Sequence, residues 1–144
     1  MADYDVIIIG GGPAGLTAGL YLSRAKRRTI LLDKEGFGGY IKNIDLIENY
    51  PGYADGVSGA QLATQMVNQA AKSGLKMELA EVTGLEIFSS SRYGACRDGN
   101  GYTATAVITA GGSKPKKLGV PGEDALFGKG VFDCALCDGG LFEG

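Results

Sequence analysis

Histidine is absent from this 144-residue sequence, and cysteine occurs only three times. A structural zinc site needs four nitrogen or sulfur ligands, so a single chain does not complete one unless a dimer shares the ligands. Three cysteines also do not suggest a framework of disulfides. The sequence therefore predicts no metal site.

Long apolar runs and basic clusters are absent as well. No run approaches the roughly 20 apolar residues that span a bilayer, and the N-terminus carries Asp3 and Asp5 instead of the apolar core of a signal peptide. The net charge is −2, without the basic stripe typical of nucleic-acid or anionic-membrane binding. We therefore expect a cytoplasmic protein whose partners include neither nucleic acid nor membrane.

Glycine, in contrast, is abundant, with 25 residues in 144, against an ordinary share of about 7%. The glycines are scattered rather than gathered in low-complexity tracts, which indicates many tight turns. The length suits about one domain, and the hydrophobic share of 44% is enough for a core.

Residues 6–15 carry the motif around which the chain is organised. The apolar, β-branched run 6–9 predicts a strand buried on both faces, and residues 13–24 predict a helix. Between them, Gly10 permits the tight turn, Gly12 lets a pyrophosphate approach the backbone, and Gly15 lets the helix lie close to the sheet. The free N–H groups at the start of such a helix suit phosphates.

The residues that follow give this glycine motif its context. A second strand over residues 29–32 ends in Asp33, at about the 20-residue separation expected of an acid that binds a ribose hydroxyl. The alternative is an ordinary strand–turn–helix with glycines in its turn. The motif favours a dinucleotide site and does not choose between FAD and NAD.

Residues 34–57 show no clear period. Structureless segments of this length are uncommon in compact domains and usually serve a ligand, although a loop with a short helix and no function is the alternative. Ser58 and Gln61 then fit a capping box. The helix that follows carries Met66 on its core face and ends before Gly74, a natural C′ residue.

Short strands are predicted for the next part of the chain. Residues 75–79 alternate as a strand does, and the stretches 85–87, 93–96 and 102–105 indicate antiparallel strands with a hairpin turn at 98–101. Residues 106–110 predict another buried strand. The lysine-rich stretch 114–117 indicates a solvated turn at a linker or domain edge.

Two cysteines near the C-terminus form a Cys-x-x-Cys pair, Cys134 and Cys137, directly followed by Asp138. Such a pair serves redox chemistry, half a zinc site, or no chemistry as two inert thiols. Asp133 fits an N-cap, which places both sulfurs near the positive end of a helical turn and favours the reactive thiolate. Asp138 is the nearest proton donor for a departing thiolate, whereas Cys96 fits a small apolar residue on a strand.

Four segments occur in an order and spacing that resemble a known family: residues 9–18, 47–52, 118–123 and 128–139. The sequence resembles the low-molecular-weight thioredoxin reductases, within the pyridine nucleotide–disulfide oxidoreductases. The resemblance covers almost the whole chain. Its most specific part is the combination of a flavin fingerprint with Cys-x-x-Cys-Asp.

The resemblance implies an α/β, Rossmann-like, three-layer FAD-binding fold, with a parallel sheet and a small antiparallel β-meander. Residues 1–114 would be the N-terminal part of the FAD domain, and residues 115–144 the start of an inserted NAD(P)H domain. The second glycine fingerprint and the returning part of the FAD domain are missing before Gly144. We therefore expect a truncated fold without nicotinamide-dependent turnover of its own, and a homodimer when complete.

The same resemblance implies a function: electrons pass from NADPH or NADH through FAD and a Cys134–Cys137 disulfide to thioredoxin. Cys137 would face the flavin, Cys134 would attack the thioredoxin disulfide, and Asp138 would be the acid. The alternatives are a related flavin disulfide reductase with another acceptor or electron donor, and a non-catalytic flavin- or nucleotide-binding fragment. NADPH and NADH are not distinguished by the residues present.

The resemblance also implies the FAD contacts. Gly10, Gly12, Pro13 and Ala14 would hold the pyrophosphate, Asp33 the ribose, and Val82 the adenine through its backbone. The remaining implied contacts are Lys34, Gly38, Gly39, Tyr40, Asn49, Thr109, Ala110 and Gly111. Tyr40 stands where the family usually has Gln, and Thr109–Gly111 replaces the usual Ala-Thr-Gly, so contacts there differ from the family pattern.

Overall fold

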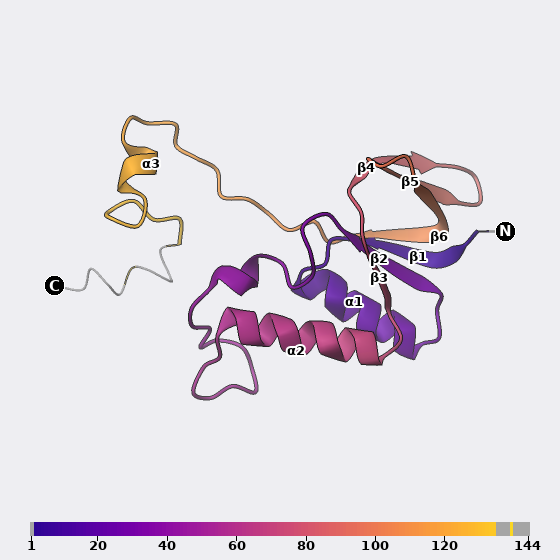
Figure 1. Ribbon diagram of the computed structural model, residues 1–144, viewed down its shortest axis with the longest axis horizontal. Coiled ribbons are helices and arrows are strands. Elements are labelled where there is room, and N and C mark those ends of the chain that lie inside the picture. Colours follow the sequence, from indigo (N-terminus) through magenta and orange to yellow (C-terminus); the bar gives the residue numbers. More distant parts are fainter. Residues whose placement is uncertain (1, 135–138, 140–144) are drawn as a thin grey trace. The chain divides into compact units, whose positions relative to one another are not determined.

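The computed structural model describes residues 2–134 and residue 139. The chain divides into two compact units, Met1–Gly112 and Ser113–Gly144. In the first unit, the helices and strands follow one another in the order below (Figure 1). They are β1 (Tyr4–Ile9), α1 (Pro13–Arg24), β2 (Thr29–Asp33), η1 (Tyr40–Asn43), α2 (Gly59–Lys72), β3 (Lys76–Leu79), β4 (Val82–Ile87), β5 (Arg92–Cys96) and β6 (Gly101–Thr109).

One six-stranded sheet, in the order β3-β2-β1-β6-β5-β4, forms the frame of the first unit. The strands β3, β2, β1 and β6 run parallel, whereas β5 pairs antiparallel with both β6 and β4. This confirms the predicted parallel sheet with a small antiparallel meander. The parallel strands also end at one edge of the sheet, where α/β folds place their ligands.

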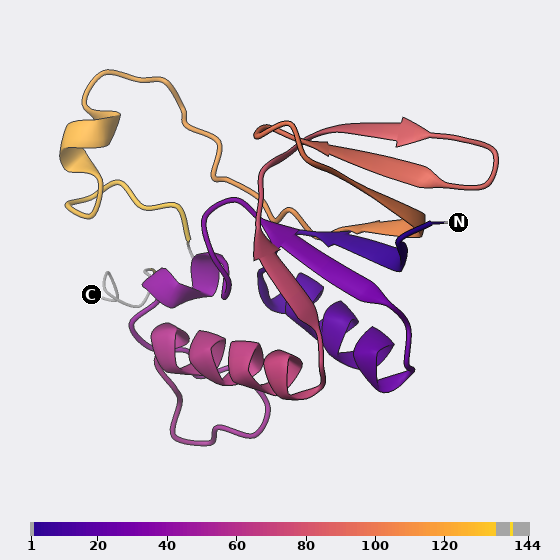
Figure 2. The ribbon, with the colours of Figure 1, turned by 45° about the vertical axis from the view of Figure 1, so that its right-hand side comes forward.

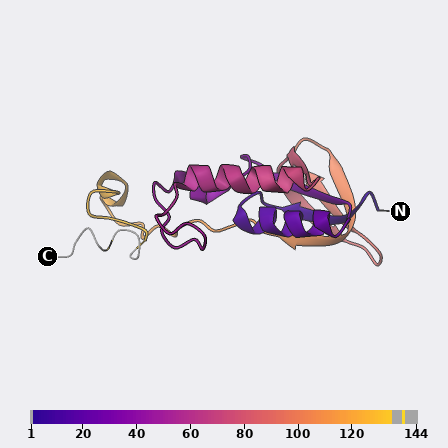
Figure 3. The same ribbon diagram turned by 90° about the horizontal axis from the view of Figure 1, so that it is seen from below.

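The two faces of β1 and β2 are covered by different layers. The helices α1 and α2 lie side by side over one face (Figure 3), where Ile8 and Leu31 are fully buried with Leu16 of α1. The β4–β5 hairpin lies on the opposite side (Figure 2), where Ile7 and Cys96 share the second apolar cluster. Burial of β1 and β2 on both faces explains their continuous apolar sequence.

Residues 101–109 form one strand, so the prediction of two separate strands over 102–105 and 106–110 is wrong. Ala104 lies opposite both Arg92 of β5 and Tyr4 of β1. Before Ala104 the strand pairs with β5, and beyond it with β1. Because β5 leaves the strand there, residues 106–109 are half-buried or exposed rather than buried as predicted.

The predicted ends of both helices are confirmed. The helix α1 spans Pro13–Arg24 as expected, with proline in its first turn. At α2, Ser58 is the N-cap and its hydroxyl accepts the Gln61 N–H at 3.2 Å. Gly74 follows the C-cap with φ +88°, and the N–H groups of Gly74 and Leu75 return to carbonyls of the last turn.

The segment between β2 and α2 is a loop that contains one short helix, η1, as one of the two interpretations of residues 34–57 expected. Ile47 and Val57 close the second half of the loop by exchanging backbone hydrogen bonds of 2.8 and 3.0 Å. The loop is therefore folded back on itself beside the start of α2.

The second unit contains one short described helix, α3 (Glu123–Leu126). The Glu123 carboxylate accepts the N–H groups of Leu118 and Gly119 at 2.9 and 2.7 Å, and Lys117 pairs with Asp124 at 2.5 Å. The lysines of 114–117 are exposed, as predicted, but the backbone of this stretch forms no turn, so the prediction of a turn there is wrong. Within the part of the chain that the structure describes, no helix is both long and apolar enough to cross a bilayer.

A polar network joins three strands of the sheet at Glu78. Its carboxylate accepts from the Tyr102 hydroxyl at 2.5 Å and pairs with Lys76 at 2.9 Å, while Lys76 also donates to the Tyr4 hydroxyl. The hydrogen bond from Tyr102, and then Lys76, lower the pKa of Glu78 below its ordinary 4.5. The same bond raises the pKa of Tyr102 to about 12.

We expect Glu78→Gln to reduce the free energy of unfolding at pH 7 by about 1 kcal/mol, after allowance for solvent screening. The folded pKa is depressed, so the stabilisation is present above pH 4.5 and is lost as the pH falls through the lower folded pKa. Urea unfolding at several pH values measures this, and the two proteins should converge in acid. Glu86→Gln on exposed β4 is the matched control. An equal loss in both variants would contradict the prediction.

Candidate functional site

A pocket of about 280 Å³ lies at the carboxyl edge of the parallel strands. Its lining residues come from the ends of β1, β2 and β6 and from the connection between β3 and β4. They are Ile9, Gly10, Leu32, Asp33, Lys34, Ala80, Glu81, Val82 and Gly111. Five residues named from the sequence as cofactor contacts therefore meet here: Gly10, Asp33, Lys34, Val82 and Gly111.

Glycine is required at two positions of the turn beside this pocket. Gly10 has φ +108°, and a Cβ there would lie 2.2 Å from the Ala110 carbonyl oxygen. A Cβ on Gly15 would lie 1.9 Å from the Gly10 carbonyl oxygen. Both obstacles are backbone atoms, so neither can rotate away. The tight turn at Gly10 and the close approach at Gly15 are thus confirmed.

The N-terminus of α1 begins at this turn. Gly12 is the N-cap, no side chain caps the helix, and its first turn carries no acidic residue. Pro13 has no N–H, but the N–H groups of Ala14 and Gly15 lack partners within the helix. The positive end of the helix dipole is therefore not neutralised by a carboxylate of its own first turn, which suits an anionic ligand.

The segment 33–39 folds over the glycine turn, and we call it the clasp. The Asp33 carboxylate accepts the Gly11 N–H at 2.7 Å, and the Gly11 carbonyl accepts the Gly38 N–H at 2.8 Å. Gly39 approaches so closely that a Cβ on it would lie 2.7 Å from the Gly12 Cα. Gly38 and Gly39, named from the sequence as FAD contacts, therefore lie against the glycine turn.

The structure adds residues that the sequence reasoning missed. The glycine motif leaves position 11 unspecified, yet a Cβ on Gly11 would lie 2.8 Å from Phe37 Cδ1 and 3.1 Å from the Asp33 Cβ. Glu81 lines the pocket, and its Oε2 accepts from Arg97 Nε at 3.0 Å. The run of three consecutive glycines over residues 10–12 could have identified Gly11. No local pattern marks Glu81 as a pocket residue.

Lys34 brings positive charge to this pocket. Its ammonium lies 3.1 Å from the Glu35 carboxylate. That contact raises the pKa of Lys34, with smaller effects of Glu81 and Asp33 in the same direction. On the β6 side of the pocket, the Ala110 N–H donates to the Ile9 carbonyl at 2.7 Å and holds the end of β6 beside the glycine turn. Thr109, the last residue of β6, is exposed.

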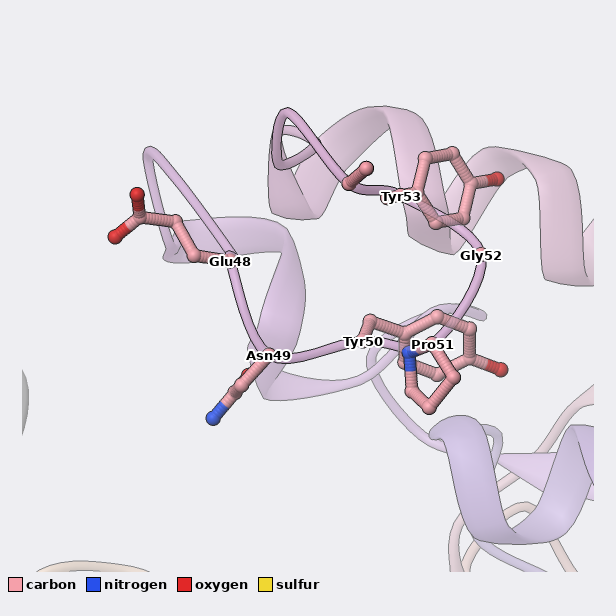
Figure 4. A pocket seen from close by; sticks show the side chains of 7 residues that line it. Glu48, Asn49, Tyr50, Pro51, Gly52 and Tyr53 are labelled. Atoms are coloured by element: carbon pink, nitrogen blue, oxygen red, sulfur yellow. The ribbon is translucent and has the colours of Figure 1, made fainter.

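Two of the named residues, Tyr40 and Asn49, lie away from this pocket. Tyr40 starts η1 and is 66% exposed. Asn49 is exposed and belongs to a separate open hollow of about 470 Å³, lined by the loop residues 48–54. In Figure 4 the side chains of Asn49 and Glu48 point away from this loop, whereas Tyr50 and Tyr53 come from its two sides. The Tyr53 hydroxyl bonds to Gln65 of α2.

The cysteines fall in different surroundings. Cys96 is buried in β5, as predicted for a small apolar residue, and burial raises the pKa of its thiol. Cys134 belongs to the second unit, while Cys137 and Asp138 lie outside the described residues. The predicted cap by Asp133 also depends on residues outside the described part. Within residues 2–134 and 139, no group of three or more acidic, cysteine or histidine side chains is placed to hold a metal ion.

Comparison with known proteins identifies the family. The model of the pyridine nucleotide-disulphide oxidoreductases matches residues 4–142, and the chain therefore belongs to this family. The fold is that of the FAD-binding domain of thioredoxin reductase, in part. The sequence prediction of the family and of the fold class is thus confirmed.

Several of the proteins that the chain matches are thioredoxin reductases. The chain is 42% identical over 142 residues to the thioredoxin reductase of Bacillus subtilis, covering 98% of this chain and 44% of the relative. Identity to that of Treponema pallidum is 44% over 140 residues, covering 97% and 45%. The crystal structure of thioredoxin reductase from Streptococcus pyogenes matches with a TM-score of 0.84 at 40% identity, covering 96% and 45%. The chain thus spans less than half the length of the curated relatives it matches.

Proposed function

We propose that the first unit binds FAD, with the pyrophosphate at the glycine turn and the adenosine in the adjoining pocket. The observation that carries this is the glycine turn itself, where Gly10 and Gly15 leave no room for a side chain beside an α1 N-terminus with no acidic first turn. These residues fit a diphosphate, because backbone N–H groups and the helix dipole both favour an anion there. The family to which the chain belongs supports the same cofactor.

Each end of the cofactor would be held by different residues. Gly10, Gly12, Pro13 and Ala14 would contact the pyrophosphate, Asp33 a ribose hydroxyl, and Val82 the adenine through its backbone. Lys34 would neutralise charge at the pocket, and the crossing Thr109–Gly111 would lie next to the pyrophosphate, where Ala110 borders Gly10. Gly38, Gly39, Tyr40 and Asn49 would lie on the flavin side, a role that the exposure of Tyr40 and Asn49 leaves room for.

The redox function that we propose belongs to the complete protein. When bound, FAD supplies two-electron transfer between a reduced nicotinamide, NADPH or NADH, and a disulfide. The Cys134–Cys137 disulfide takes up two electrons and two protons and becomes a dithiol. The Cys134 thiolate attacks one sulfur of a thioredoxin-type disulfide, so that a mixed disulfide forms and the other sulfur of the acceptor leaves as a thiolate. Cys137 then displaces the reduced acceptor and restores the bridge, with Asp138 giving its proton to the departing thiolate.

The remaining parts of the proposal concern organisation. Residues 1–114 would belong to the FAD domain and residues 115–144 to the start of an NAD(P)H domain. The similarity to thioredoxin reductases supports a thioredoxin-type protein as partner, a homodimer and a cytoplasmic location. An assay with thioredoxin against other thiol carriers separates this acceptor from the alternatives, such as a peroxiredoxin-linked carrier.

Flavin binding by the 144-residue chain tests the first step of this proposal. We expect the purified chain to bind FAD weakly, since the pyrophosphate and adenosine contacts lie in the first unit. ADP should displace the FAD, and FMN, which lacks adenosine and the second phosphate, should bind much more weakly. Visible flavin absorbance after gel filtration and flavin fluorescence both measure this. No bound flavin after addition of FAD would count against the proposal.

A further inference from the structure

The Asp33 carboxylate is largely occupied by the protein's own backbone. Its Oδ2 accepts the Gly11 N–H at 2.7 Å, and its Oδ1 accepts the N–H groups of Glu35 and Gly36 at 2.8 and 3.0 Å. A carboxylate offers about four lone-pair positions. Three are already used, so a single acceptor position remains, on Oδ2.

These bonds hold the phosphate turn from one side. Gly11 is buried, and both of its backbone polar groups are bonded to the clasp, the N–H to Asp33 and the carbonyl to the Gly38 N–H. Phe37 and the Asp33 Cβ fill the space beside it. The peptide of Gly11 therefore has its orientation set before any ligand arrives, and so does the turn that leads to the N-terminus of α1.

We propose that Asp33 is chiefly a positioning residue, which shapes the phosphate turn through Gly11 and accepts only one of the two ribose hydroxyls of a bound adenine nucleotide. This inference rests on the proposed nucleotide site. It departs from the simpler expectation, in which the carboxylate serves the ribose alone and has no influence on the phosphates.

The two interpretations predict opposite changes in affinity when Asp33 is replaced by Asn and the ligand has no ribose. Asp33→Asn removes a negative charge near the phosphate site, which by itself strengthens the binding of inorganic pyrophosphate. The new amide NH₂ also takes the place of one acceptor oxygen. In one orientation it faces the Gly11 N–H, and in the other it faces the N–H groups of Glu35 and Gly36 and breaks that turn. We therefore expect pyrophosphate to bind about tenfold more weakly to the variant. Asp55→Asn, the same chemical change at an exposed carboxylate outside the pocket, is the matched control and should bind like the wild type.

Isothermal titration of the 144-residue chain with pyrophosphate, ADP, 2′-deoxy-ADP and 3′-deoxy-ADP measures these effects. In the wild type, one deoxy nucleotide should bind like ADP and the other about tenfold more weakly. Equal losses for both deoxy nucleotides, or pyrophosphate binding to Asp33→Asn at least as tight as to the wild type, would overturn the inference. If the wild type binds neither ADP nor pyrophosphate, the proposed function fails.

Amide hydrogen exchange without ligand tests the clasp separately from the nucleotide site. In the wild type, the amides of Gly11, Glu35 and Gly36 should be protected, and in Asp33→Asn their protection should fall while that of β1 is retained. Unchanged protection in a folded variant would contradict the positioning role, even if ADP binds. Retained protection of β1 also shows that the variant has not simply unfolded.

Discussion

Gly15→Ala is expected to destabilise the protein by about 3 kcal/mol and to weaken FAD binding more than tenfold. The new Cβ would lie 1.9 Å from the Gly10 carbonyl oxygen and 3.3 Å from Ile8 Cγ2, where ordinary contact begins at 3.4 Å. The helix α1 must move away from the end of β1 to make room. That movement takes the N–H groups of its first turn away from the pyrophosphate. Urea unfolding and FAD titration measure the two effects.

Gly84→Ala is the control for this variant. It makes the same chemical change in the exposed strand β4, where the new Cβ would be 3.7 Å from the Ala95 Cβ, an ordinary contact. We expect its free energy of unfolding to stay within about 0.5 kcal/mol of the wild type. A Gly15→Ala protein that unfolds at the wild-type urea concentration would show that the close approach of α1 to β1 is not required.

Cys134→Ser is expected to lower thioredoxin reduction by the complete protein by more than about 1,000-fold, because serine supplies no thiolate to attack a disulfide. Reduction of the bound flavin by nicotinamide should remain, since that step precedes the dithiol. Stopped-flow absorbance of the flavin and a thioredoxin-coupled assay separate these two steps. If the variant retains disulfide reduction, Cys134 is not the thiolate that attacks the acceptor, and the proposed mechanism is wrong.

Cys96→Ala is the matched control in the same protein. The Cys96 side chain is buried in β5, and burial, with the nearby Asp98 and Glu78 carboxylates, raises the pKa of its thiol. A thiol with a raised pKa is a poor nucleophile at neutral pH. We therefore expect thioredoxin reduction close to the wild-type rate, with at most a modest loss of stability from the smaller side chain. A large loss of activity here would transfer the redox role to Cys96.

Most of the fold follows from local signals in the sequence. The start of α1 at Pro13, the cap by Ser58 and the end of α2 before Gly74 are short-range effects of single side chains, and the structure confirms all three. The apolar runs of β1 and β2 indicate burial on both faces, as found. These elements depend on neighbours within a few residues, so the sequence was sufficient.

The break predicted within residues 102–110 shows where local patterns do not suffice. The alternation of side chains changes near Thr105, but the strand continues and only its partners change, from β5 to β1 at Ala104. Which strands lie beside a residue is decided by pairing over long separations. A change of pairing partner therefore resembles a strand end when the sequence is viewed alone.

For the candidate site, the sequence by itself determined the glycine turn, the acid at the end of β2 and the family to which the chain belongs. Only the tertiary structure decided that Asp33 bonds to Gly11, 22 positions earlier in the chain, and that Glu81 lines the same pocket. The physical reason is that glycine spacing and helix starts are set by local backbone geometry. The partners of a carboxylate, in contrast, are set by which loops meet at the carboxyl edge of the sheet.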